Sequence, residues 1–240
     1  MSYFIYNGIS SLEYGIQIEH YPVYPVPERV FETLEIPGRN GDLIRYTGGM
    51  RNVVQPYDIF FKPSVPDANS YMVASEVARW LNTPISYAQL EDSYRPGIFK
   101  NAIFTGPADW QMHFVKYGKT TLEFNCQPQS WIKDGQEIIA VQNGSILYNA
   151  YKTAKPMIYI SGNGNCSVGI GAYSIGVETV GDWRLIVDSE NETYRTPGGV
   201  SPVDVEISFG YPVLAERGET QISFSGGVTD LRIVPRWWTL

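Results

Sequence analysis

Short apolar stretches, each ended by a turn signal, recur along nearly the whole chain and constrain its fold most. Many are rich in aromatic and β-branched residues, which pack well on a pleated surface, while Gly and Pro break helices and set turns. The composition agrees, because 14% of the residues are aromatic and 23 Gly and 16 Pro are available for turns. The sequence therefore predicts a mostly β protein built from short strands.

The first half contains one helix signal among its expected strands. Apolar residues at spacings of three and four over 71–81 predict a helix, with Glu76 and Arg79 facing outward and Asp67 or Asn69 as its cap. The expected strands cover residues 29–36, 55–62, 87–90, 97–104 and 119–126. Pro-Gly and Asn-Gly in Ile36–Leu43 predict a tight turn, and Tyr117-Gly118-Lys119 is expected to be a hairpin tip.

A polar, turn-rich stretch over 129–135 predicts a boundary between two domains, 1–130 and 131–240. After it, apolar stretches recur at the spacing of about 8–12 residues that is typical of a β-sandwich, and no helix signal follows residue 90. The strands expected there cover residues 156–161, 166–170, 173–180, 183–188, 203–209, 220–224 and 228–234.

The charge and the cysteines exclude several classes of protein. The net charge is −7, with 10 Lys and Arg against 13 Asp and Glu in residues 1–130 and 8 against 12 in residues 131–240. Neither half therefore has the clustered cations of a nucleic-acid binder. No apolar run approaches the roughly 18 residues of a membrane span and no secretory signal is visible, so a soluble protein made in a cytoplasm is expected. Cys126 and Cys166 are too few for a disulfide framework, and Cys126 is expected to be a buried free thiol.

The candidate chemical motifs do not meet the requirements of their templates. The Gly-rich stretch 162–171 lacks the lysine of a phosphate-binding loop and leads into a strand, so a hairpin turn followed by a bulged strand is expected. Two histidines and two cysteines show no metal-ligand spacing, and the acidic residues of 188–192 are expected to form a solvated loop. We expect no catalytic residue, no metal and no cofactor.

Two alternatives involving sugars stay open at this point. Trp237 and Trp238 would place their rings on opposite faces of an extended strand, so one of them could stack on a sugar, whereas Trp183 is expected in the core. A glycoside hydrolase needs two facing carboxylates, whose separation depends on the fold. The acids in strand-like segments are Glu28, Glu32, Glu35, Asp204 and Glu206.

Taken together, several segments resemble the distal tail proteins (Dit) of long, flexible-tailed bacteriophages, in the same order along nearly the whole chain. The Ile-Pro-Gly-Arg-Asn-Gly motif of Ile36–Gly41 and the Pro-Arg-Trp ending carry the resemblance most strongly. Trp238 departs from it, because a basic residue is common there, and no long arm is inserted in the second domain. The similar segments are Tyr6-Asn7-Gly8-Ile9, Tyr14-Gly15-Ile16, Ile36–Gly41, Ala78–Asn82, Phe124–Pro128, Pro156–Gly164 and Ile233–Trp238.

The resemblance implies a virion structural protein at the tail tip, in the baseplate of a phage or prophage, with a role in host adsorption. Its first domains would form a ring of six subunits around a channel through which DNA passes, as a β-sandwich-like domain with one α-helix. Its second domains would be galectin-like β-sandwiches (jelly rolls). The implied partners are the tail tube protein, the tape-measure protein, the tail-associated hub protein and receptor-binding proteins, with no membrane.

The resemblance and the exposed turn residues together indicate candidate assembly contacts. The Ile36–Leu43 loop is expected at a ring or hub contact, because its turn residues expose Arg39 and Asn40. The aromatic, proline-rich segment that contains Tyr21 and Tyr24 is a second candidate contact. A non-enzymatic hub protein is therefore predicted, with a carbohydrate-binding module that contributes to host cell-wall adhesion as the alternative.

Overall fold

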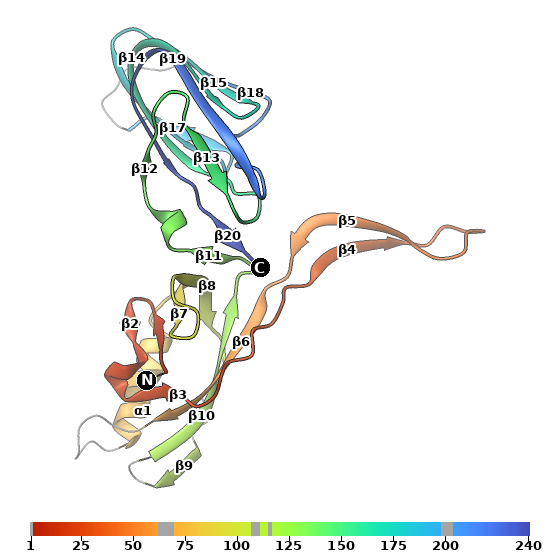
Figure 1. Cartoon of the computed structure of the whole chain (residues 1–240). Coiled ribbons are helices and arrows are strands. Elements are labelled where there is room, and N and C mark those ends of the chain that lie inside the picture. The colour runs from red at the N-terminus through yellow and green to blue at the C-terminus, as the bar shows by residue number, and fades with distance from the viewer. Residues whose placement is uncertain (1, 62–69, 107–110, 115–116, 198–203) are drawn as a thin grey trace. The chain divides into compact units, whose positions relative to one another are not determined.

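The computed structural model describes residues 2–61, 70–106, 111–114, 117–197 and 204–240, and it divides into two compact units. The first unit comprises residues 1–130 and Leu240, and the second comprises residues 131–239. The prediction of a mostly β chain with one α-helix is confirmed for the described residues (Figure 1). No helix in the described part is long and apolar enough to cross a membrane.

The first unit is built on one antiparallel sheet in the strand order β2-β1-β7-β8-β10-β6-β3, with β9 paired to β10. Strand β6 shows why its strands form, because alternate residues from Val53 to Phe61 are buried while Val54 and Asp58 are exposed. The elements are β1 (Phe4–Tyr6), β2 (Ile9–Ser10), η1 (Ser11–Tyr14), β3 (Ile16–Ile18), β4 (Arg29–Leu34), β5 (Leu43–Met50), β6 (Val53–Phe61), α1 (Ser70–Leu81), β7 (Ala88–Asp92), β8 (Ile98–Phe104), β9 (Gln111–Phe114) and β10 (Tyr117–Cys126).

Helix α1 packs against the core of this unit through Val77, Trp80 and Leu81. The Trp80 ring stacks on Phe4, and its indole Nε1 donates to the carbonyl of Tyr6 at 3.2 Å. Glu76 and Arg79 are exposed, as predicted, and they form an i,i+3 ion pair. The predicted caps Asp67 and Asn69 lie outside the described residues.

The predicted hairpin tip at Tyr117-Gly118-Lys119 is wrong. These three residues lie within β10, where Tyr117 pairs with Phe114 and Lys119 pairs with Gln111 of β9. Glycine is typical of turns, but Gly118 is aligned with Phe61 in the long β10–β6 ladder. A glycine in a strand interior often marks an irregularity rather than a turn, and the register here does shift between Tyr117 and Gly118.

The second unit is built mainly on one curled sheet of antiparallel strands, which is organised by two long strands, β14 and β19. The first half of β14 pairs with β16 and with the end of β19, whereas its second half pairs with β15 and with the start of β19. Each long strand therefore belongs to both halves of the curled sheet (Figure 1). The elements are β11 (Ser130–Ile132), η2 (Asp134–Gln136), β12 (Ile139–Ala140), β13 (Ile146–Asn149), β14 (Met157–Ile170), β15 (Tyr173–Glu178), β16 (Asp182–Asp188), β17 (Thr193–Arg195), β18 (Asp204–Ser208), β19 (Gly218–Val234) and β20 (Trp238–Thr239).

Glycines form the bend that β14 and β19 share. The predicted hairpin turn within 162–165 is wrong, because β14 runs on through these residues with register shifts on either side of Gly162. The predicted break between 224 and 228 is equally absent from β19. A Cβ on Gly227 would lie 1.6 Å from the carbonyl oxygen of Asn163, so the two strands approach too closely there for any side chain. The bulge agrees with the prediction for this stretch, whereas the continuity of the strand does not.

Each unit has its own cluster of buried apolar side chains, which forms its core. In the second unit Trp183 is buried, as predicted, and its Nε1 donates to the carbonyl of Gly164 in the bend at 2.8 Å. Cys126 and Cys166 are buried free thiols, one in each unit, which confirms the prediction for Cys126.

Candidate assembly surface

Strands β4 and β5 form a two-stranded ribbon that pairs with neither larger sheet (Figure 1). Its turn contains the predicted loop Ile36–Leu43, with Gly38 and Gly41 at positive φ, where glycine has no steric penalty. Arg39 and Asn40 lie at this turn and are exposed, and Arg39 N donates to the carbonyl of Ile36 at 3.1 Å. The described structure therefore places both candidate contact residues at the tip of the ribbon.

One face of the ribbon is apolar and open to solvent. Phe31 lies opposite Tyr46 with their ring centroids 5.6 Å apart, and Ile44 lies on the same face. Phe31 is 50% exposed and Ile44 is 64% exposed. The guanidinium of Arg29 lies 5.7 Å from the centre of the Tyr46 ring, at the base of the ribbon.

The other face is mixed. Leu34 and Leu43 pair near the tip, and Glu32 faces Arg45 at 3.9 Å. An isolated two-stranded hairpin is marginally stable in water. Both faces of the ribbon expose large apolar side chains, and such surfaces are typical of interaction sites. The ribbon is therefore a candidate for a contact with another chain.

Tyr21 and Tyr24 precede the ribbon and differ in their surroundings. Tyr21 is 67% exposed, and its ring packs against Tyr24 and Tyr94. The hydroxyl of Tyr24 donates to Asp92 Oδ1 at 2.9 Å, and the guanidinium of Arg95 lies 3.6 Å from the centre of its ring. Tyr21 therefore presents free surface, whereas Tyr24 fastens the segment to the body of the first unit.

Asp92 is the centre of that attachment, and no sequence pattern pointed to this role. Its carboxylate also accepts from the hydroxyl of Tyr57 at 2.9 Å and from the backbone N–H groups of Tyr94 and Arg95. Burial raises the pKa of Tyr57 well above its usual range, and the nearby Asp92 carboxylate raises it further. Four donors on one carboxylate make this a rigid anchor for the segment that leads into the ribbon.

Trp237 and Trp238 both pack against the core of the second unit. Trp238 Nε1 donates to the carbonyl of Thr153 at 2.9 Å, and the Trp237 ring lies 6.2 Å from that of Tyr151. A Cβ on Gly135 would lie 2.7 Å from Trp237 N, so the backbone at Trp237 is closely covered. Both rings have the surroundings of packing residues.

A polar groove of about 610 Å³ lies on one sheet face of the second unit. Glu178, Asp204 and Glu206 contribute carboxylates, and Ser167 and Ser225 contribute hydroxyls. No aromatic ring is among the described residues that line the groove. A sugar that binds by stacking needs an aromatic side chain, and the described lining of this groove has none, although several polar groups converge there.

The prediction of a solvated acidic loop at 188–192 needs correction at its first residue. Asp188 accepts from Arg236 Nη1 at 2.5 Å and from Nη2 at 3.3 Å, and only 16% of its side chain is exposed. Asp188 also accepts from the backbone N–H groups of Glu190 and Asn191, so it closes the loop. Among the residues that the structure describes, no group of three or more His, Cys, Asp or Glu side chains could hold a metal ion.

The similarity of this chain to known proteins lies in its structure. No family model and no curated protein sequence matches this chain. The crystal structure of the SPP1 Dit (gp 19.1) protein, reported as a paradigm of the hub adsorption apparatus in phages that infect Gram-positive bacteria, aligns with a TM-score of 0.71 and 14% identity and covers 97% of this chain and 98% of that one. A chain of the phage P2 baseplate in its activated conformation with Ca aligns with a TM-score of 0.50 and 10% identity over 97% of each chain. Across nearly its whole length the chain therefore has the fold of the SPP1 Dit protein, as its resemblance to distal tail proteins predicted.

Proposed function

We propose that the chain is a structural hub component of a phage or prophage tail, in which six sister copies close into a ring through their first units. The observation that carries this proposal is the exposed apolar face of the β4–β5 ribbon, because contact between such a surface and water is unfavourable. The similarity to the SPP1 Dit protein supports it, because the whole chain shares that protein's fold. A closed ring needs a heterologous contact, and a ribbon on one subunit that covers a different surface of the next provides one.

The second unit would then serve as a docking surface at the tail tip. Its groove and its open edge strand β18 are polar, which suits a contact that forms after the ring has closed. The tail tube protein, the tape-measure protein, the tail-associated hub protein and receptor-binding proteins are the proposed partners, with DNA as passing cargo. The surplus of acidic residues suits such a channel, because like charges do not adhere.

We further propose that the chain acts by assembly and catalyses no reaction. The sugar-binding alternative has less support, since Trp237 and Trp238 serve as packing residues and the groove of the second unit is lined without a ring among its described residues. Calorimetry with host cell-wall sugars and turnover of a chromogenic glycoside test the two alternatives. Binding or turnover by the purified chain would favour them over a purely structural role.

The ring is tested by light scattering and negative-stain imaging of the purified chain and of Phe31→Ser. Covering a half-exposed phenylalanine removes roughly 100 Å² of apolar surface from water, or about 2 kcal/mol per contact. The variant should therefore dissociate at protein concentrations at which the parent chain is a ring. Phe209→Ser is the matched control, because Phe209 is 85% exposed in the second unit and should leave assembly unchanged. A strictly monomeric parent chain, or an unaffected Phe31→Ser ring, would contradict the proposal.

A further inference from the structure

Lys100 is buried over most of its side chain and has no ion-pair partner among the described residues, which is uncommon for a lysine. It lies in β8 on the same side as Ala102 and Phe104, both of which belong to the core of the first unit. Only 5% of Lys100 is exposed. Its Nζ is not among the buried side-chain atoms that lack a partner, so the ammonium group reaches the protein surface, where no described side chain pairs with it.

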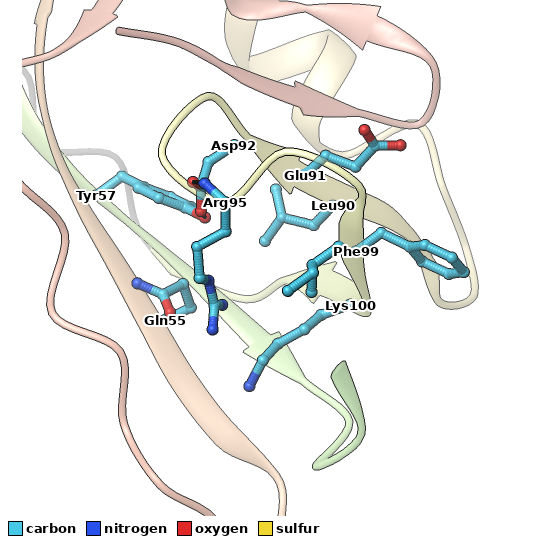
Figure 2. Close-up of a pocket in the computed structure, with 9 residues that line it drawn as sticks. Gln55, Tyr57, Leu90, Glu91, Asp92, Arg95, Phe99 and Lys100 are labelled. Atoms are coloured by element: carbon cyan, nitrogen blue, oxygen red, sulfur yellow. Dashed lines mark hydrogen bonds between the residues drawn. The ribbon is translucent and has the colours of Figure 1, made fainter. Parts of the chain in front are cut away.

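A second cation lies beside it. Arg95, in the β7–β8 loop, lines the same small cavity as Lys100, and its buried Nε has no hydrogen-bond partner among the described residues. Figure 2 shows both charged groups pointing the same way, with the Gln55 amide next to the guanidinium. Burial lowers the pKa of Lys100, and the charge of Arg95 lowers it further, while Cys126 acts in the opposite direction.

The nearby carboxylates are engaged elsewhere. Asp92 accepts hydrogen bonds from Tyr24, Tyr57 and two backbone N–H groups, which uses its acceptor capacity. The Glu91 carboxylate points away from the two cations in Figure 2. Asp92 also lines the cavity and its negative charge offsets part of the positive charge there, but no described carboxylate forms an ion pair with Lys100 or Arg95.

Gln55 completes the cluster. It is 1% exposed, its Nε2 donates to the carbonyls of Val23 and Pro56, and its Oε1 has no partner among the described residues. The cavity next to these groups measures about 10 Å³, close to the volume that one water-sized group needs. Two donors and one acceptor therefore surround room for a single oxygen.

We propose that Lys100 and Arg95 form an oxyanion site in which one oxygen of a carboxylate or phosphate group occupies the cavity beside Gln55. The guanidinium and ammonium groups supply charge-assisted hydrogen bonds, which are the strong kind. A hydrogen phosphate could also donate its hydroxyl to Gln55 Oε1, whereas a carboxylate could not. The site goes beyond the proposed hub function and does not depend on it.

The test is the melting temperature of the full chain in rising inorganic phosphate or acetate, at an ionic strength held constant with sodium chloride. We expect the melting temperature of the parent chain to rise, and Lys100→Met to abolish the rise while being no less stable in the absence of either anion. Lys119→Met is the matched control, because Lys119 is a half-exposed lysine of β10 that already forms an ion pair with Glu19. Arg95→Gln provides a second variant, read by the same anion response, if Lys100→Met fails to fold.

The source of the oxyanion follows from the same variants. If a neighbouring copy supplies a carboxylate, Lys100→Met should weaken self-association at least tenfold and acetate should dissociate the parent assembly. If free phosphate is the ligand, self-association should be unchanged and phosphate should raise the melting temperature more than acetate does. A parent chain that responds to neither anion, or a Lys100→Met chain that responds as the parent does, would overturn the site.

Discussion

The ion pair between Asp188 and Arg236 should contribute a measurable, pH-dependent part of the stability of the second unit. Hydrogen bonding to Arg236 is the main cause that lowers the pKa of Asp188 from 3.8 to about 2, against the opposing effect of burial. At about 1.4 kcal/mol per factor of ten in proton affinity, the change corresponds to about 2 kcal/mol. Little screening by solvent applies, since the two side chains are 16% and 17% exposed.

The direction of the pH effect follows from linkage. A carboxyl group whose pKa is lower in the folded state stabilises that state above its unfolded pKa, and the stabilisation is lost as the pH falls through the folded pKa. Asp188→Asn should therefore lower the free energy of unfolding by about 2 kcal/mol at neutral pH. The difference between the variant and the parent chain should shrink as the pH falls from about 4 towards 2.

Urea unfolding followed by tryptophan fluorescence measures this difference, because Trp183 is buried in the same unit. Glu190→Gln is the control, since it removes one charge from an exposed position in the same loop and breaks no ion pair that the structure records. An Asp188→Asn chain as stable as the parent at neutral pH, or a difference that stays constant down to pH of about 2, would refute the assignment of this ion pair.

Two further predictions concern the core. Gly227→Ala should prevent the close approach of β19 to Asn163 and lower the free energy of unfolding by more than about 3 kcal/mol, which loss of the near-ultraviolet circular dichroism would show. Gly49→Ala is the control and should change little, because a Cβ at Gly49 would meet open space. A stable Gly227→Ala chain would contradict the tight bend. Burial raises the pKa of the Cys126 and Cys166 thiols to about 11, so both should react slowly with a thiol reagent at pH of about 8 until the chain is unfolded, and rapid reaction of the native chain would disprove their burial.

The sequence alone identified the features that depend on neighbouring residues. The helix over 71–81 could be predicted because its apolar residues recur at the helical period, and the β4–β5 turn because Gly38 and Gly41 allow positive φ. The exposed tip with Arg39 and Asn40 followed from the same turn chemistry. The resemblance to distal tail proteins added the fold, which the structural comparison confirms.

One signal of the oxyanion site was present in the sequence. Lys100 alternates in phase with Ala102 and Phe104 along β8, so it occupies a core-facing position. A single charged residue at a core-facing position near the end of a strand can also extend its charged group into solvent. The sequence could therefore indicate the position but not the burial.

Only the tertiary structure decided which distant residues meet. Asp188 pairs with Arg236 across 48 positions and Tyr24 with Asp92 across 68, and a local pattern carries no information about such partners. The continuity of β14 and β19 was also hidden, because glycines there allow one backbone to approach another, while in a sequence they look like turns. Turn and period signals arise from local sterics, so the sequence could predict the helix and the β4–β5 turn. Strand continuity, register and the burial of charge arise from packing between strands, so only the fold could decide them.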